Sequence, residues 1–77
     1  MQNRIANQLQ KCYEKYGRYS SAHEAYGVLL EEVDELWDIV KQKPSERDLQ
    51  ALQSEIIDCI VVLFKMNEDI VEKRNVR

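Results

Sequence analysis

Residues 49–70 read LQALQSEIIDCIVVLFKMNEDI. Apolar residues recur in this stretch in steps of three and four, which is the period of an amphipathic helix. They form a heptad seam that needs a partner helix along its length, made of Leu49, Leu52, Ile56, Cys59, Leu63, Met66 and Ile70. A second apolar edge of the same helix consists of Ile57, Ile60, Val61 and Phe64. The other helices of so short a chain can hardly cover both edges. The pattern therefore predicts an all-α bundle that another subunit completes.

Two shorter helices are expected before this segment. The apolar spacing of residues 3–16 is helical, and Gly17 suits a left-handed stop after it. The second helix is predicted to start after Ser21, which forms a capping box with Glu24, and to end at about Gln42. Its apolar stripe, which we expect to pack, comprises Tyr26, Leu29, Leu30, Val33, Leu36, Trp37 and Val40.

The third helix is predicted to begin at Ser45, directly after Pro44, and to run to about Lys73. Asp48 lies three residues after Ser45, so the two residues form a second capping pair. The sequence thus predicts a three-helix chain.

Composition limits the classes of protein that fit. The 77 residues fit one domain, residues 1–77, and a domain of this size buries only about 60% of its unfolded surface, so it is marginal as a monomer. Cys12 and Cys59 fall within helical patterns, as expected of free thiols in a reducing cytoplasm. A net charge of -3 argues against a nucleic-acid footprint, and no apolar run approaches the roughly 20 residues that cross a bilayer. We expect a cytoplasmic protein with no nucleic-acid or membrane partner.

One carboxylate interrupts the apolar part of the third helix. Asp58 is the only polar residue between Ile56 and Phe64, and Glu55 precedes it by three residues on the same helix face. An ionised carboxylate among apolar neighbours is costly unless it is paired or bound to a metal. The alternative is that Glu55 and Asp58 mark the solvent side of the helix.

The second helix carries a matching pair of acids. Helical phase places Glu31, Asp34 and Asp38 opposite the apolar stripe, where solvation is expected. Glu32 and Glu35 fall on a different line, which has an apolar residue one turn before and one turn after them. This arrangement indicates that Glu32 and Glu35 face protein.

Two such pairs on facing helices would bring four negative charges together in a poorly solvated cleft. Their repulsion requires a cation or raised pKa values. A cluster of carboxylate oxygens without His or Cys favours a hard cation, Mg²⁺ or Mn²⁺. The predicted metal ligands are Glu32, Glu35, Glu55 and Asp58.

These residues also match a known motif. Glu31-Glu32-x-x-Glu35, a spacer of nineteen residues and Glu55-x-x-Asp58 resemble the EExxE…ExxD motif of the MazG-like, all-α NTP pyrophosphatase superfamily. The similarity covers about residues 22–70. It implies a homo-oligomer, a dimer or a tetramer, that hydrolyses NTP or dNTP to the monophosphate and pyrophosphate.

The resemblance also implies roles for individual residues. The catalytic set would be Glu31, Glu32, Glu35, Glu55 and Asp58. Four of these would ligate Mg²⁺, in agreement with the helical phase, and Glu31 would be an outer ligand or would orient the attacking water.

Three further residues are candidates for binding the nucleotide. Lys65 lies two turns after Asp58 and either meets a phosphate oxygen or is solvated. His23 and Tyr26, one turn apart, are candidates for contacts to the base or sugar. The preferred interpretation is an exposed position for His23 and a place in the packed stripe for Tyr26. Two other functions stay open: a non-catalytic helical oligomer that retains a metal or nucleotide-sensing site, and a coiled-coil interaction module with solvated acids.

Overall fold

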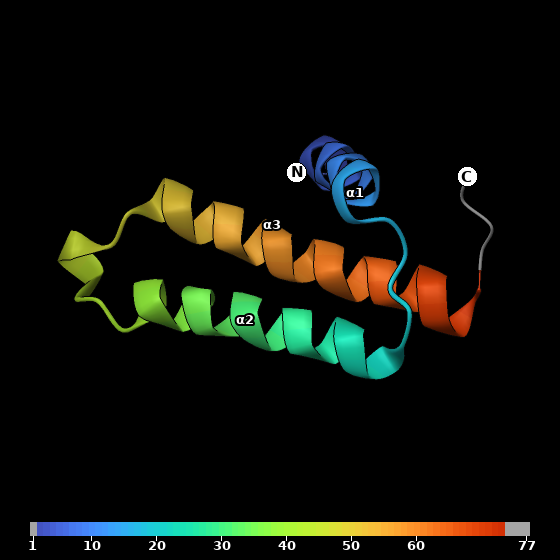
Figure 1. Cartoon of the computed structure of the whole chain (residues 1–77). Helices are drawn as coiled ribbons and strands as arrows, with labels where there is room; N and C mark the ends of the chain where they lie inside the picture. Colours follow the sequence, from blue (N-terminus) through green and yellow to red (C-terminus); the bar gives the residue numbers. More distant parts are fainter. Residues whose placement is uncertain (1, 74–77) are drawn as a thin grey trace.

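A computed structural model describes residues 2–73, and this part of the chain is helical without any strand. Helix α1 spans Gln2–Tyr16, α2 spans Ala22–Val40 and α3 spans Leu49–Met66. A 3₁₀ turn, Pro44–Glu46, precedes α3, and a π-helical turn, Asn67–Val71, extends it. Helices α2 and α3 form an antiparallel hairpin, and α1 lies across α3 (Figure 1). The prediction of an all-α, three-helix chain is confirmed.

The predicted stop and start between α1 and α2 are confirmed. Gly17 has a φ of +71° and its N–H donates to the carbonyl of Tyr13 at 2.9 Å, which closes α1. Ser21 Oγ accepts a hydrogen bond from the N–H of Glu24 at 3.1 Å. The Glu24 carboxylate accepts one in return from the N–H of Ser20 at 2.6 Å. These bonds satisfy amides that have no partner within the helix.

The predicted start of α3 at Ser45 is wrong. Ser45 belongs to the 3₁₀ turn that Pro44 begins, and Asp48 is itself the N-cap. Its Oδ1 accepts from the N–H groups of Gln50 and Ala51 at 3.0 and 3.2 Å. A proline fixes its own φ and tolerates the first turn of a short helix, so the turn after Pro44 closes separately and α3 starts later.

Each of the two apolar edges of α3 is only partly buried, because Met66 and Ile70 of the heptad seam pack against the core and Phe64 of the second edge is exposed. Ile57 and Val61, on the second edge, are buried, whereas Leu49 and Leu63 of the heptad seam are exposed. The core consists of Tyr19, Ala25 and Val62, with Val28, Leu29, Met66 and Ile70 packed against it. The chain therefore covers only one side of its helical hairpin.

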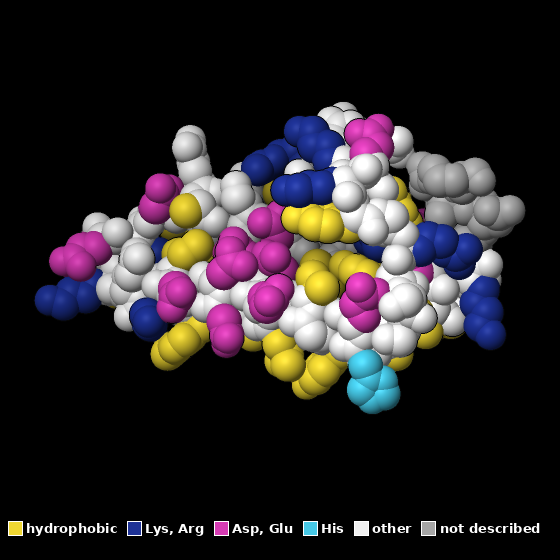
Figure 2. Space-filling model, in the orientation of Figure 1, with side chains coloured by type: hydrophobic (Ala, Val, Ile, Leu, Met, Phe, Trp, Pro, Cys, Tyr) yellow, Lys and Arg dark blue, Asp and Glu magenta, His cyan; other side chains and the backbone are white. Residues whose placement is uncertain are grey.

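The expectation that the stripe of α2 packs holds within one chain for Leu29, which lies against the core, but most of the stripe is exposed. Trp37 and Tyr26 are 58% and 55% exposed. They belong to an apolar surface, partly visible along the lower edge of Figure 2, made of Tyr26, Leu30, Val33, Trp37 and Val40 of α2 with Leu49, Ile56, Leu63 and Phe64 of α3. The reason is the position of α1, which packs on α3 away from this surface. No described helix is long and apolar enough to cross a membrane.

Candidate metal centre

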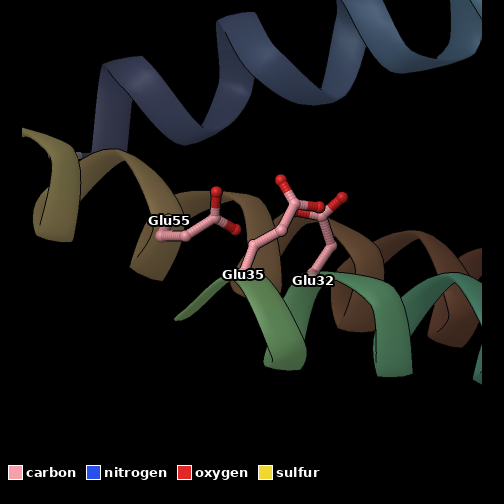
Figure 3. A group of neighbouring side chains, drawn as sticks. All are labelled: Glu32, Glu35 and Glu55. Carbon is pink, nitrogen blue, oxygen red and sulfur yellow. The ribbon is translucent and has the colours of Figure 1, made fainter. Parts of the chain in front are cut away.

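Three glutamates from α2 and α3 converge on one point between the two helices. Glu32 and Glu35 extend from successive turns of α2, and Glu55 reaches toward them from α3 (Figure 3). Each offers one carboxylate oxygen, and these three oxygens lie within 4.8 Å of one another. Figure 2 shows acidic side chains gathered over the middle of the hairpin. The hairpin thus brings together three of the four predicted ligands.

Asp58 lies one turn further along α3, beside this glutamate trio. It lines the adjoining cleft, and its charge contributes to the raised pKa values of Glu32 and Glu55. Burial raises the pKa of Asp58 itself, and the positive charge of Arg4 on α1 acts against that increase. Arg4 donates hydrogen bonds to Gln53 Oε1 at 2.7 Å and Ser54 Oγ at 3.2 Å, so the start of α1 is fixed beside the site.

The electrostatics of the trio are unfavourable in the absence of a cation. Burial, a hydrogen bond that the protonated Glu32 carboxyl donates to Glu55, and the charges of Glu35, Glu55 and Asp58 raise the pKa of Glu32 to about 8. Burial and the charges of Glu35 and Asp58 also raise the pKa of Glu55, against the hydrogen bond with Glu32. When Glu32 is ionised that bond is lost. Glu55 Oε2 is a buried atom without a hydrogen-bond partner among the described residues.

These observations fit a hard divalent cation. The donors are all carboxylate oxygens, which Mg²⁺ and Mn²⁺ prefer. A buried acceptor without a donor is costly, and a cation would satisfy it. The residues present therefore suit a hard cation such as Mg²⁺, which Glu32, Glu35 and Glu55 could hold.

A cleft of about 380 Å³ adjoins the carboxylates and lies between the three helices. Glu31, Glu32 and Asp58 line it near the trio, and apolar residues, Cys12, Val28, Val61 and Val62, form much of its wall. Gln8, Tyr16, Arg18, Tyr19 and Glu24 line the rest. Its volume is within the usual range for small-molecule sites. Glu31 is exposed, as helical phase predicted.

Sequence reasoning missed Arg18 and Tyr19. Both belong to the connection between α1 and α2, where no helical period assigns a side chain to a face. Arg18 is the one basic residue among the described residues that line the cleft, and its side chain is 41% exposed. The one feature of the sequence that could have pointed to these two residues is their place directly after the glycine that ends α1, and that is a weak indication of a binding role.

Lys65 does not lie where either of its interpretations put it. It is fully buried, so the solvated interpretation is wrong, and it is not among the residues that line the cleft. Its ammonium is 3.2 Å from Asp69 Oδ2 and 3.6 Å from the centre of the Tyr19 ring. Tyr13, near the end of α1, also contacts the ammonium, which lies 4.7 Å from the centre of its ring. The structure thus gives Lys65 a partner within the protein.

His23 and Tyr26 are not brought to the carboxylates either. Both are exposed and line a separate, shallow depression together with Ala22 and Met66. They lie on the side of α2 that carries the exposed apolar stripe. Within one chain, neither residue is placed to touch a ligand bound beside Glu32.

Comparisons of the chain with known protein families, with curated proteins and with solved structures find no match. The resemblance to MazG-like proteins therefore depends on the sequence pattern of residues 22–70, chiefly the motif between Glu31 and Asp58. The placement of the motif's residues is a separate observation, because it depends on how α2 and α3 pair and not on any relative.

Proposed function

We propose that this protein is a Mg²⁺-dependent nucleoside triphosphate pyrophosphohydrolase that releases NMP or dNMP and pyrophosphate. The observation that carries the proposal is the glutamate trio, with carboxylate oxygens within 4.8 Å of one another and an unpartnered oxygen on Glu55, beside a cleft of about 380 Å³. The motif resemblance supports pyrophosphate release over other metal-dependent hydrolyses.

Each acidic residue takes a specific part. Glu32, Glu35 and Glu55 hold Mg²⁺, or Mn²⁺ in its place, and Asp58 contributes to the same site or to a second position beside it. The bound ion supplies positive charge that offsets the charge developing on the pyrophosphate leaving group. Glu31, exposed at the cleft, orients the attacking water or accepts its proton. Arg18 offsets the negative potential of the cleft and favours entry of an anionic substrate.

A second copy of the chain is part of the proposal. The exposed apolar surface of α2 and α3 carries Trp37 and Leu63 at 58% and 51% exposure, and large apolar patches on small soluble domains mark interaction sites. Pairing of this surface with its counterpart would complete the bundle. Sedimentation at micromolar concentration should show a dimer or a tetramer, and Trp37→Glu should shift it toward smaller species. A folded wild-type monomer would refute this part.

The test of function is a screen of canonical and modified NTPs and dNTPs with Mg²⁺ that follows pyrophosphate release. We expect release from at least one triphosphate, and its loss when EDTA removes the ion. Binding of Mg²⁺ without hydrolysis of any triphosphate would instead favour the non-catalytic oligomer with a metal or nucleotide-sensing site.

A further inference from the structure

Helix α1 places an arginine beside the carboxylates of the candidate metal centre. Arg4 Nη1 donates to Gln53 Oε1 at 2.7 Å, and Arg4 Nη2 donates to Ser54 Oγ at 3.2 Å. Ser54 directly precedes Glu55 in α3 and lies one turn before Asp58 on the same helix face. Burial raises the pKa of Asp58, and the charge that opposes this increase is that of Arg4. The guanidinium is therefore held next to the acidic site.

The order of residues along the hairpin puts Arg4 at the end of the site that lies away from the cleft. The cleft is lined between residues 24 and 32 of α2 and between residues 58 and 62 of α3. The glutamate trio adds Glu35 and Glu55, each one turn closer to the loop that joins the two helices. The bonds of Arg4 to α3 lie at this same end, directly before Glu55 in the sequence.

The face of α1 that borders the cleft leads to the same position. Gln8, Cys12 and Tyr16 line the cleft and are spaced four residues apart. Arg4 precedes Gln8 by four residues, so it continues their line by one turn. Figure 3 shows the carboxyl groups of the trio pointing toward the side on which α1 crosses. A ligand that leaves the cleft over the trio would meet Arg4 next.

The guanidinium is accessible and keeps donors for a ligand. Arg4 is exposed, and its guanidinium carries more N–H donors than the two described bonds use. Both of these bonds go to uncharged acceptors, and Arg4 forms no salt bridge within residues 2–73. Paired N–H groups of this kind match the oxygens of a phosphate.

The charge of the acidic site gives a reason for an arginine at this end. One Mg²⁺ would offset only part of the negative charge of the ionised trio and Asp58, so the surroundings of a bound ion would stay acidic. A phosphate chain that passes the ion would be repelled by this excess. Arg4 is placed to offset it, and arginine clamps stabilise phosphoryl groups in this way.

We propose that Arg4 binds the terminal phosphates of the substrate, so that α1 holds the pyrophosphate that is released. The nucleoside would then lie in the cleft, and the phosphate chain would pass the trio toward the start of α1. This inference rests on the proposed function for the identity of the substrate. It assigns to α1 an anion site that inorganic pyrophosphate can probe without any hydrolysis.

Arg4→Gln tests the site because it removes the charge, and Lys11→Gln is its matched control. Lys11 is exposed on the same helix, two turns further along, and does not line the cleft. Calorimetry measures the binding of inorganic pyrophosphate at a saturating, fixed concentration of free Mg²⁺. Arg4→Gln should weaken this binding roughly tenfold, the loss of a charge-assisted hydrogen bond, and Lys11→Gln should change it little. Arg4→Lys should restore part of the affinity, because it returns the charge without the paired N–H groups.

Binding of Mg²⁺ alone separates this role from a structural one. Arg4 and a cation repel each other, so Arg4→Gln should bind Mg²⁺ at least as tightly as the wild type while it binds pyrophosphate more weakly. Gln53→Ala removes the 2.7 Å bond but keeps the charge of Arg4, so it should weaken pyrophosphate binding less than Arg4→Gln does. Equal weakening of both ligands in Arg4→Gln would show that Arg4 only positions α1, and a loss as large in Gln53→Ala would show the same.

The outcomes for this inference and for the proposed function are distinct. Pyrophosphate binding that depends on Arg4, with no hydrolysis of any triphosphate, would refute the proposed function and leave the anion site. Pyrophosphate release from a triphosphate, with unchanged pyrophosphate binding in Arg4→Gln, would do the reverse. Absence of pyrophosphate binding to the wild type in the presence of Mg²⁺ would also overturn the inference.

Discussion

Two groups of carboxylates in this protein have opposite surroundings: Asp69 is buried, whereas in the glutamate trio Glu32 and Glu55 are half-buried and Glu35 is exposed. Asp69 accepts hydrogen bonds from the Tyr13 hydroxyl, the Tyr19 N–H and the Lys65 ammonium. Burial alone would raise the pKa of Asp69, but these donors outweigh it and lower the pKa. Among residues 2–73, no hydroxyl, backbone N–H or ammonium group donates to the glutamate trio, whose internal hydrogen bond joins Glu32 to Glu55, and the pKa of Glu32 is raised to about 8.

The difference separates a structural charge from a binding charge. The Asp69 group is complete without a ligand and fixes the end of α1 against the end of α3. The glutamate trio, in contrast, stores repulsion that a cation would relieve. Substitutions in the two groups should therefore have opposite effects on stability and unequal effects on activity.

The largest expected effect is on catalysis. Asp58→Asn keeps the size of the side chain but removes its charge beside the trio, so hydrolysis should fall by orders of magnitude, because the metal site supplies several kcal/mol to the transition state. Metal-free stability should stay level or rise. Asp34→Asn is the control, since Asp34 is exposed and absent from the trio and the cleft. Equal rates of pyrophosphate release from the two variants would rule out the carboxylate site.

The second effect is on folding. Asp69→Asn leaves the Lys65 ammonium without its counter-charge at a site where both side chains are 0% exposed. Breaking a buried pair in this way costs about 3–5 kcal/mol, which is a large part of the stability of so small a domain. Urea unfolding measures the loss.

The matched control for Asp69→Asn is the double variant Lys65→Met/Asp69→Asn. It removes both charges and should recover part of the stability, because no unpaired charge is left. A double variant less stable than Asp69→Asn alone would show that the ion pair is not what stabilises this end of the molecule.

The same contrast explains what the sequence could predict. Glu32, Glu35 and Glu55 lie on long helices, where a period of 3.6 residues assigns each side chain to a face, and their convergence was predicted. Lys65 and Asp69 read as an ordinary i,i+4 surface pair, which sequence alone cannot tell from a buried one. Their burial depends on where the α1–α2 connection crosses, and that path has no periodic signal.

The side of the hairpin that α1 covers was also beyond prediction. Both apolar edges of α3 have helical spacing, so either could have faced α1. Ile57 and Val61 are buried and Leu63 is exposed, a choice that Arg4 helps to set by bonding to Gln53 and Ser54. Such polar contacts between distant helices are not encoded in the apolar period.

A third, smaller effect is the response to metal. Mg²⁺ or Mn²⁺ should raise Tm by binding only the folded protein. At an ion concentration 100 times Kd, the free energy of unfolding should increase by about 2.7 kcal/mol. Glu32→Gln or Glu55→Gln should remove most of the shift. Glu31→Gln should remove less, because Glu31 is exposed and outside the trio. No shift in the wild type up to millimolar concentrations would count against the site.

The smallest expected effect is the pH dependence of the metal-free protein, and here the two groups act in different windows. Glu32 has a pKa of about 8 in the folded state against 4.5 as a free side chain. Between these values the folded protein holds a proton that the unfolded chain has released, so stability falls as pH rises. The pKa of Asp69 is lowered from 3.8, so its contribution is lost only as pH falls below that range.

Thermal unfolding in EDTA from about pH 5 to about pH 8 therefore isolates the glutamate trio. The wild type should lose Tm across this range, and about 1 kcal/mol would correspond to about 4–8 °C in a domain of this size. Glu32→Gln does not titrate, so its Tm should change less with pH, while saturating Mg²⁺ should flatten the wild-type curve by holding Glu32 ionised at every pH. Because Asp69 is fully ionised throughout this range, Asp69→Asn should lower Tm without changing the slope. A wild-type Tm that rises with pH would mean that the trio is neither crowded nor poorly solvated, and the case for a cation between α2 and α3 would fail with it.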